Sequence, residues 1–257
     1  MTHKIHLTLD GPFATVTLNR PDKLNALDPE MLGGLERLAG QIEENETVRV
    51  VLLTGAGERA FCVGADINAW AALEALDMWR RWIRDGHRVF DRLARLRQPV
   101  IAVLNGYAFG GGLELALAAD IRLAADGIEL AMPEVKIGTI PGWGGTWRLP
   151  ALLGPARAKQ MILTGMRIDA RKAERWGLVN EVFPREALMD EALALADAVA
   201  ENAPLSVQMA KQLIDGGGAV ASLHLEALAG ALAASTDDGR EGIASFRERR
   251  SAQFKGH

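Results

Sequence analysis

Short apolar segments that alternate with turns and helical patterns constrain the fold of this chain most strongly. Residues 48–53 (VRVVLL) and 100–104 (VIAVL) are almost continuously apolar, which is typical of strands buried on both faces of a parallel sheet. Parallel neighbours need a crossover connection, and helical periodicity over residues 29–44 supplies one before the first segment. The sequence therefore predicts an α/β fold.

The two ends of the chain differ in predicted structure. Residues 5–9 and 13–18 alternate apolar and polar side chains around a DGP turn, which predicts a hairpin. Short strands are also expected at 120–124 and 128–132, before a glycine- and proline-rich loop at 133–145 without regular structure. Beyond this loop strands nearly vanish, and helical patterns cover 155–163, 170–176, 185–201, 205–215, 219–234 and 238–250.

The charge and cysteine content exclude several classes of protein. The 29 Lys and Arg residues against 33 Asp and Glu residues give a net charge of −4, so no global positive field exists to bind nucleic acid. The single cysteine, Cys62, excludes an intramolecular disulfide and any multi-cysteine metal site. No segment resembles a secretory signal or an apolar membrane span. These observations predict a cytoplasmic protein that binds neither nucleic acid nor membranes.

Two glycine-containing loops offer backbone hydrogen-bond donors. Gly110, Gly111 and Gly112 lie between a predicted buried strand and an apolar helix, where N–H groups can point at an anion or a developing oxyanion. A tight, closely packed turn explains the same glycines equally well. Ala65 in the FCVGAD segment offers a second exposed N–H beside Gly64, although an ordinary strand-to-helix loop would also have this sequence.

Two carboxylates stand out from their surroundings. Glu114 lies inside the apolar LELALAA segment, where a buried carboxylate would have a raised pKa suited to proton transfer. A carboxylate stabilised by the helix N-terminus is the alternative. Glu134 lies in the 133–145 loop and, taken alone, is expected to be solvated. Any pairing of the two must come from the tertiary fold, because they are too far apart in sequence to share a helix face.

The remaining reactive side chains give weaker signals. Cys62 lies between apolar neighbours without a nearby histidine, which predicts an inert buried thiol. The five histidines show no metal-binding spacing, so no metal site is expected. Among the six tryptophans, only Trp143 is expected to contact a ligand, because it follows Glu134 in the same loop.

Several long segments, in order along nearly the whole chain, resemble the crotonase superfamily, with the closest resemblance to enoyl-CoA hydratase. They are NRPDKLNAL at 19–27, FCVGADI at 61–67, NGYAFGGGLELALAADIRLA at 105–124, PEVKIGTIPGWGGTWRL at 133–149, AERWGLVNEV at 173–182 and STDDGREGIASFRERRSAQF at 235–254. The resemblance implies a spiral of repeated β-β-α units with two nearly perpendicular sheets over residues 1–195. It also implies a C-terminal helical region over residues 196–257 that forms trimers, which commonly pair into hexamers.

The resemblance also implies a chemistry. The substrate would be a coenzyme A thioester, with coenzyme A part of the substrate and no separate cofactor. The N–H groups of Ala65 and Gly111 would form an oxyanion hole, Glu114 would activate water, and Glu134 would supply the α-proton. Gly142 would help to orient Glu134 through its backbone. The residues implied in binding substrate or coenzyme A are Lys23, Leu24, Ala65, Asp66, Ile67, Gly142, Trp143, Phe246 and Arg249, the last pair reaching a neighbouring subunit's ligand.

The predicted reaction is the syn hydration of trans-2-enoyl-CoA to 3-hydroxyacyl-CoA, and alternatives stay open. A Δ3,Δ2-enoyl-CoA isomerase would need Glu134 but not Glu114, and a specialised enzyme such as a carnitinyl-CoA dehydratase would use both. A non-catalytic CoA-binding subunit is the third alternative. Trp143, Trp147 and the Trp- and Arg-rich segment at 70–84 depart from the family pattern where the acyl group is shaped, so they bear on the acyl preference.

Overall fold

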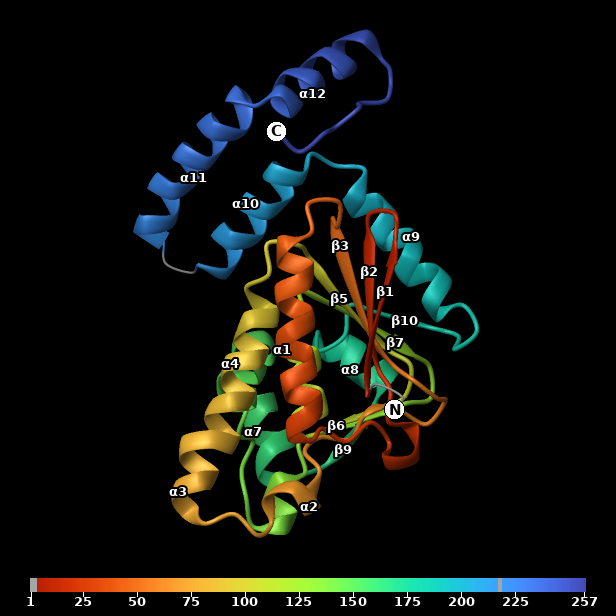
Figure 1. Ribbon diagram of the computed structural model, residues 1–257, viewed down its shortest axis with the longest axis vertical. Helices are drawn as coiled ribbons and strands as arrows, with labels where there is room; N and C mark the ends of the chain where they lie inside the picture. The colour runs from red at the N-terminus through yellow and green to blue at the C-terminus, as the bar shows by residue number, and fades with distance from the viewer. Residues whose placement is uncertain (1–3, 217–218) are drawn as a thin grey trace.

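The computed structural model describes residues 4–216 and 219–257, which form two β-sheets surrounded by helices, with a helical arm at the C-terminal end (Figure 1). The larger sheet has the order β1-β2-β3-β5-β7-β10, and the smaller has the order β4-β6-β8-β9. The large-sheet strands are β1 (Ile5–Asp10), β2 (Phe13–Leu18), β3 (Val50–Gly55), β5 (Val100–Leu104), β7 (Ile121–Ala125) and β10 (Glu181–Phe183). The small-sheet strands are β4 (Ala60–Cys62), β6 (Tyr107–Phe109), β8 (Glu129–Ala131) and β9 (Arg167–Asp169).

A repeated strand pair generates both sheets. Strands β3, β5 and β7 lie in the large sheet, and the strand that follows each of them, β4, β6 or β8, lies in the small sheet. Neighbouring strands of the repeat are parallel within each sheet, whereas the β1–β2 hairpin and the β8–β9 pair are antiparallel. The predicted α/β fold of repeated β-β-α units is therefore confirmed, as is the N-terminal hairpin.

Helices cover the large sheet and bury its strands. Helix α1 (Pro29–Glu44) begins at Asp28, whose side chain accepts a 2.9 Å hydrogen bond from the N–H of Met31. It packs against β1, β2 and α4 (Arg84–Ala94), which lies beside it in Figure 1. Helix α9 (Leu188–Ala200) packs against β3, β5 and β7. Every residue of β3 and β5 is buried as a result, which matches their continuously apolar sequences.

Shorter helices connect the strands. Before α4 lie η1 (Pro21–Lys23), α2 (Ile67–Trp70), α3 (Ala75–Asp77) and the π-helical turn η2 (Met78–Ile83). After β6 and β8 lie α5 (Gly111–Leu117), η3 (Glu134–Ile137), α6 (Gly145–Leu153), α7 (Pro155–Thr164) and α8 (Ala170–Trp176). No helix in the described ranges is both long enough and apolar enough to cross a bilayer.

The structure corrects the sequence prediction between residues 133 and 183. The glycine- and proline-rich segment contains regular structure, namely η3 and the start of α6, and α6 accommodates Pro150 in its interior. Burial of Arg148 and Leu149 holds this helix in place although its sequence contains helix-breaking residues. Strands β9 and β10 were also not expected, because three residues are too few to show alternation.

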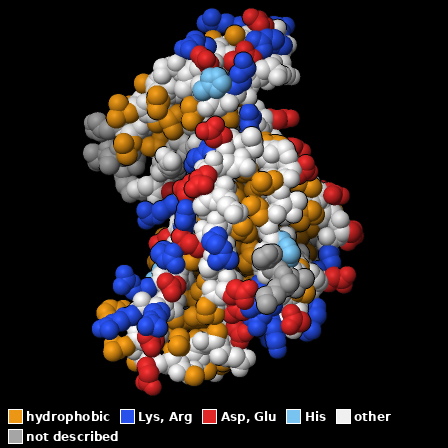
Figure 2. Space-filling view, viewed as in Figure 1, with side chains coloured by type: hydrophobic (Ala, Val, Ile, Leu, Met, Phe, Trp, Pro, Cys, Tyr) orange, Lys and Arg blue, Asp and Glu red, His pale blue; other side chains and the backbone are white. Residues whose placement is uncertain are grey.

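The C-terminal helices α10 (Pro204–Asp215), α11 (Ala219–Ser235) and α12 (Asp237–Glu248) extend away from the sheets (Figure 1). The buried Lys211 anchors α10 through a 2.7 Å ion pair with the half-buried Asp120. The boundary predicted between residues 195 and 196 falls inside α9, and the division of the chain into two regions stays a prediction. Apolar side chains gather on the exposed surface over α11 (Figure 2), including Leu225, Leu228 and Leu232. Trimer or hexamer formation through this region stays a prediction.

Candidate active site

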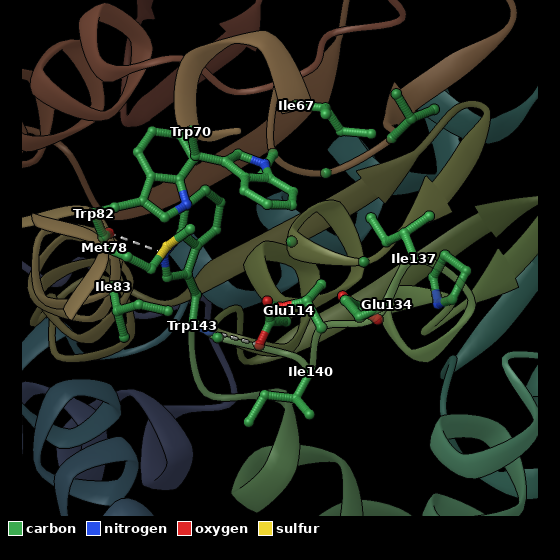
Figure 3. A pocket seen from close by; sticks show the side chains of 18 of the residues that line it. Ile67, Trp70, Met78, Trp82, Ile83, Glu114, Glu134, Ile137, Ile140 and Trp143 are labelled. Atoms are coloured by element: carbon green, nitrogen blue, oxygen red, sulfur yellow. Dashed lines mark hydrogen bonds between the residues drawn. The ribbon is translucent and has the colours of Figure 1, made fainter. Parts of the chain in front are cut away.

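A cavity of about 280 Å³ lies where the chain after β4, the start of α5, the η2 turn and the segment after β8 converge (Figure 3). Glu114 and Glu134 both line it, together with Ala65, Gly111 and Trp143. The fold thus brings together the five residues that the sequence analysis placed at the reaction centre. The other lining residues are Val63, Gly64, Ile67, Trp70, Met78, Trp82, Ile83, Gly110, Pro133, Lys136, Ile137, Thr139, Ile140 and Gly142.

The two predicted donor loops lie side by side. A Cβ atom added to Gly64 would lie 3.1 Å from the nitrogen of Gly111, and one added to Gly111 would lie 3.4 Å from the nitrogen of Ala65. Within the ranges that the structure describes, neither of these N–H groups donates a hydrogen bond to the protein. Gly64 itself has φ +101° and is fixed because Leu27 donates a 2.7 Å hydrogen bond to its carbonyl. Two free donors therefore face one cavity, which is the arrangement of an oxyanion hole.

The glycine run is also a closely packed turn. Gly110 adopts φ +53°, and a Cβ atom on Gly112 would lie 2.1 Å from the carbonyl oxygen of Cys62. The explanation as a closely packed turn is therefore confirmed, and the same packing of α5 against β4 places Gly111 at the cavity. The role of its N–H as an oxyanion donor stays a prediction.

Glu114 is buried and held by backbone hydrogen bonds. The residue is only 2% exposed. Its Oε1 atom accepts hydrogen bonds from the N–H groups of Trp143 (2.8 Å) and Gly145 (2.7 Å). Burial raises the pKa of Glu114, whereas the N–H groups of the 142–145 segment and the charge of Arg148 act in the opposite direction. The carboxylate is thus oriented through one oxygen by groups that favour its ionised form.

Glu134 has a different environment. Both of its carboxylate oxygens are buried, and neither has a hydrogen-bond partner among the described residues. Burial, with a contribution from the charge of Glu114, raises the pKa of Glu134 to about 7. The expectation of a solvated loop carboxylate is therefore wrong. The expectation that Gly142 orients Glu134 is also wrong, because the Gly142 backbone instead lowers the pKa of Glu114.

Aromatic and aliphatic side chains form one wall of the cavity, beside Glu114. In Figure 3, Trp70, Trp82 and Trp143 lie to one side of Glu114, with Met78 and Ile83. Trp143 was expected to be the only tryptophan at a ligand, whereas Trp70 and Trp82 line the cavity as well. The 70–84 segment was singled out as a departure from the family pattern, and it does supply the other two. Its helical spacing gave no sign of which side chains turn inward.

Trp147 does not line the cavity. Its ring is 58% exposed and stacks on the guanidinium group of Arg148, 4.5 Å from its ring centroid. The sequence analysis had placed it with Trp143 near the acyl group. Its position in α6 turns it outward, since the neighbouring Arg148 and Leu149 take the buried side of that helix.

The residues predicted to contact coenzyme A lie in several places. Ile67 lines the cavity and is 51% exposed, which places it at the mouth. Lys23 and Leu24 lie beside the cavity wall without lining it, since the Leu24 carbonyl accepts a 3.2 Å hydrogen bond from Val63. Phe246 and Arg249 lie at the C-terminal end of α12, in the arm that extends away from the sheets (Figure 1). The ligand contacts of these residues stay predictions.

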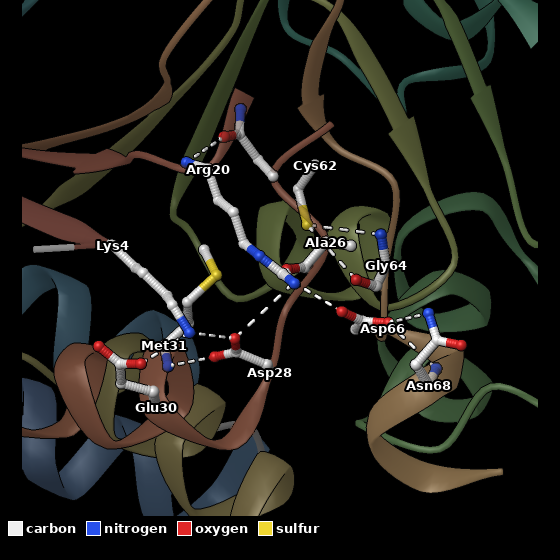
Figure 4. Close-up of polar contacts among 11 residues, drawn as sticks. Lys4, Arg20, Ala26, Asp28, Glu30, Met31, Cys62, Gly64, Asp66 and Asn68 are labelled. Atoms are coloured by element: carbon white, nitrogen blue, oxygen red, sulfur yellow. Dashed lines mark hydrogen bonds and ion pairs between the residues drawn. The ribbon is translucent and has the colours of Figure 1, made fainter. Parts of the chain in front are cut away.

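Asp66 makes structural contacts at the edge of the site. Its carboxylate accepts a 2.7 Å hydrogen bond from Arg20 and caps α2 through the N–H of Asn68 (Figure 4). Arg20 also approaches Asp28, which is paired with Lys4. This network ties the 20–28 segment to the Ala65 donor loop. The Asp66 side chain is thus committed to the protein, and any ligand contact of this residue would involve its backbone.

Two further observations concern side chains that were not expected to react. The predicted burial of Cys62 is confirmed, its sulfur accepts a hydrogen bond from Gly64, and burial raises the pKa of the thiol to about 12. Its lack of reactivity stays a prediction. Among the described residues, no group of three or more His, Cys, Asp or Glu side chains has the geometry to hold a metal ion.

Comparison with known proteins shows the family to which the chain belongs. The sequence model of the enoyl-CoA hydratase/isomerase family matches residues 10–257, so the chain belongs to this family, as the crotonase resemblance predicted. It is 39% identical to the short-chain-enoyl-CoA hydratase of Clostridium acetobutylicum, over 98% of this chain and 97% of that one. It is also 39% identical to the carnitinyl-CoA dehydratase of Proteus mirabilis, with both chains fully covered. The enoyl-CoA hydratase structure from Bacillus anthracis superimposes with a TM-score of 0.95 at 38% identity, covering 99% of this chain and 100% of that one.

Proposed function

We propose that this protein hydrates trans-2-enoyl-CoA thioesters to 3-hydroxyacyl-CoA. The observation that carries the proposal is the pair of buried carboxylates, Glu114 and Glu134, with different hydrogen bonding and one shared cavity. Adding water across a double bond requires one group that takes a proton and another that gives one. Different environments can keep one carboxylate ionised and the other protonated, which suits them to these two roles.

The backbone donors would hold the thioester carbonyl. With its oxygen between the N–H groups of Ala65 and Gly111, the negative charge that develops when water attacks the β-carbon has two preorganised donors. Each such donor typically contributes about a hundredfold or more in rate. Because neither N–H has a partner among residues 4–216 and 219–257, no hydrogen bond within these ranges must break when the substrate binds.

The two carboxylates would act in sequence. Glu114, oriented by Trp143 and Gly145, takes a proton from water as the water oxygen bonds to the β-carbon. The electrons of the double bond move to the thioester oxygen and form an enolate. Glu134, protonated, then gives its proton to the α-carbon, and the carbonyl re-forms. Net transfer of a proton from Glu114 back to Glu134, through exchange with water, restores the starting state, so no metal or organic cofactor enters this scheme.

The coenzyme A portion would leave the cavity past Ile67, whose exposure marks the open mouth. Leu24 accepts a hydrogen bond from Val63 of the cavity wall, and we propose that Lys23 and Leu24 contact the pantetheine arm. Phe246 and Arg249 would reach the ligand of a neighbouring subunit if the chain forms the predicted trimer. Testing this part requires the oligomeric state in solution, measured by light scattering, together with the Kd of coenzyme A for the wild type and for Phe246→Ala.

The direct test follows the loss of conjugated-thioester absorbance with crotonyl-CoA, for the wild type and for Glu114→Gln and Glu134→Gln. Both variants are expected to lose most of the rate, because each removes one proton-transfer group. Migration of a 3-enoyl double bond that survives Glu114→Gln would instead indicate the isomerase. Turnover of crotonobetainyl-CoA but not crotonyl-CoA would indicate the carnitinyl-CoA dehydratase. Tight binding of coenzyme A without turnover would indicate a non-catalytic subunit.

A further inference from the structure

The cavity has an open mouth and a closed end. Ile137 and Ile140 are 56% and 65% exposed, whereas Trp82 and Trp143, which also line the cavity, are only 7% and 2% exposed. Figure 3 shows Trp143 and Ile137 on opposite sides of Glu114. The buried tryptophans therefore close the end of the cavity that lies away from the solvent.

Trp143 is fixed in this position by several contacts. Its indole nitrogen donates a 3.2 Å hydrogen bond to the carbonyl of Trp82, and its ring centroid lies 5.1 Å from that of Trp82 and 5.3 Å from that of Phe90. Its backbone is held at the same time by Glu114. With the ring fixed on several sides, a ligand cannot displace it without breaking these contacts.

Gly86 in α4 provides the space that the indole occupies. A Cβ atom at this position would lie 2.1 Å from Nε1 of Trp143, well inside any allowed contact. The residue is buried within a regular helix, so its backbone conformation does not require glycine. The absence of a side chain is needed because the indole of Trp143 occupies that space. Gly86 and Trp143 thus form a complementary pair, and a smaller side chain at 143 would leave a void that extends toward α4.

The ring also lies next to the oxyanion hole. A Cβ atom on Gly111 would lie 2.7 Å from Cζ3 of Trp143, so the six-membered ring packs directly against one of the two donor residues. A thioester carbonyl held by Gly111 therefore places the first carbons of the acyl chain beside this ring. Carbons further along a straight chain would meet the indole.

We propose that Trp143 limits the acyl group to short chains by closing the cavity beyond the β-carbon, an inference that rests on the proposed hydratase function. A crotonyl group would fit between the oxyanion hole and the indole. A ten-carbon chain would need the volume that Trp143 fills against Gly86. Pockets that are blocked in this way discriminate by about tenfold or more for each methylene that cannot be accommodated.

The test compares kcat/KM for crotonyl-CoA and trans-2-decenoyl-CoA. The wild type should prefer crotonyl-CoA, and Trp143→Ala should move the ratio toward decenoyl-CoA by about tenfold or more. Trp147→Ala is the matched control, since that tryptophan is in the next turn of the same segment but points to solvent. Its ratio should equal that of the wild type. A folded, active Trp143→Ala with an unchanged ratio would overturn the inference.

Further variants keep the test decisive if the alanine variant does not fold. Trp143→Phe retains a ring in the cluster and should shift the ratio in the same direction by a smaller factor, so an unchanged ratio in this folded variant would equally overturn the inference. Adding Gly86→Ala to Trp143→Phe should reverse part of the shift by refilling the void. If the wild type hydrates both substrates equally, the chain-length role of Trp143 is contradicted but the hydratase function is not. If the wild type hydrates neither substrate, the hydratase function itself is contradicted.

Discussion

The guanidinium group of Arg148 forms an ion pair with the carboxylate of Asp91 and so joins α6 to α4. The same guanidinium donates a 3.2 Å hydrogen bond to the carbonyl of Trp143, whose N–H holds Glu114. The side chain of Arg148 is 7% exposed, whereas that of Asp91 is 48% exposed. Arg148 is therefore a buried residue that supports the segment whose N–H groups hold Glu114.

Arg148→Met should change the pH dependence of the reaction. The positive charge of Arg148 lowers the pKa of Glu114, so its removal raises that pKa, and Glu114 must be ionised to accept a proton. The acidic limb of the kcat/KM profile should move to higher pH, and the free energy of unfolding should fall by about 1–3 kcal/mol through the lost hydrogen bonds. Arg157→Met, on the exposed surface of α7, is the control. An unmoved acidic limb would contradict this role.

The wild-type profile should also have an alkaline limb near neutral pH. Glu134 must carry a proton to protonate the α-carbon, and burial raises its pKa to about 7. We therefore expect kcat/KM to fall as the pH rises through about 7, and to fall again as the pH drops through the pKa of Glu114. Because the two charges interact, the two limbs report the pair. A rate that stays constant from pH 6 to pH 9 would contradict the assignment of Glu134 as the acid.

Glu134→Gln should stabilise the protein at alkaline pH. The folded-state pKa of Glu134 lies above its unfolded value, so ionisation opposes folding, and wild-type stability falls as the pH rises from about 4.5 to 7. A glutamine removes this penalty, by at most about 3 kcal/mol at pH 8 and by nothing near pH 4. Urea unfolding at both pH values measures the difference, with Glu181→Gln on the exposed side of β10 as the control. Equal effects of Glu134→Gln at the two pH values would count against a buried, partnerless carboxyl group.

Gly64→Ala should impair the oxyanion hole. A Cβ atom at this position would lie 2.9 Å from the Phe109 carbonyl and 3.1 Å from the Gly111 nitrogen, so the two donor loops would have to separate. We expect kcat to fall by about a hundredfold, the cost of one lost donor. Gly127→Ala is matched to it, because Gly127 has φ +77° but a Cβ atom added there would meet no atom within 4 Å. Similar losses of kcat in both variants would mean that backbone strain, and not the donor geometry, is responsible.

Cys62 should resist modification in the folded protein. Burial raises its pKa to about 12, so almost no thiolate forms at pH 8 and a thiol reagent has no access. Ellman's reagent is expected to detect no thiol under native conditions and one thiol per chain in guanidinium chloride. Rapid native modification that also abolishes turnover would show that the loop before Ala65 opens.

The strongly periodic elements of the sequence predicted the α/β class, and its motifs predicted residues that the fold brings to one cavity. The buried strands β3 and β5 and the helix α1 have patterns that only one environment satisfies, so they were predicted within two residues. Glu114 was recognisable because burying a carboxylate in an apolar helix is costly unless the group is hydrogen-bonded or paired. These signals are local, and local signals survive without knowledge of the tertiary contacts.

Other features depend on contacts between distant segments. Glu134 is in a loop sequence, and its oxygens are buried by the tertiary fold, which places its carboxylate against Gly110 at the cavity. The outward position of Trp147 and the inward position of Trp82 follow from how α6 and η2 are rotated, which their short helical patterns do not define. The N–H groups of the 142–145 segment interact with Glu114 and not with Glu134, and this likewise depends on where α6 begins.

The most direct measurement of the central claim is the mass and structure of the product formed from crotonyl-CoA in D2O. Hydration by Glu114 and Glu134 predicts 3-hydroxybutyryl-CoA with oxygen on the β-carbon and one deuterium on the α-carbon, formed by the wild type and lost in both glutamine variants. Two outcomes would contradict the hydratase function. One is the recovery of unreacted crotonyl-CoA, and the other is an isomer with a migrated double bond and no hydroxyl group.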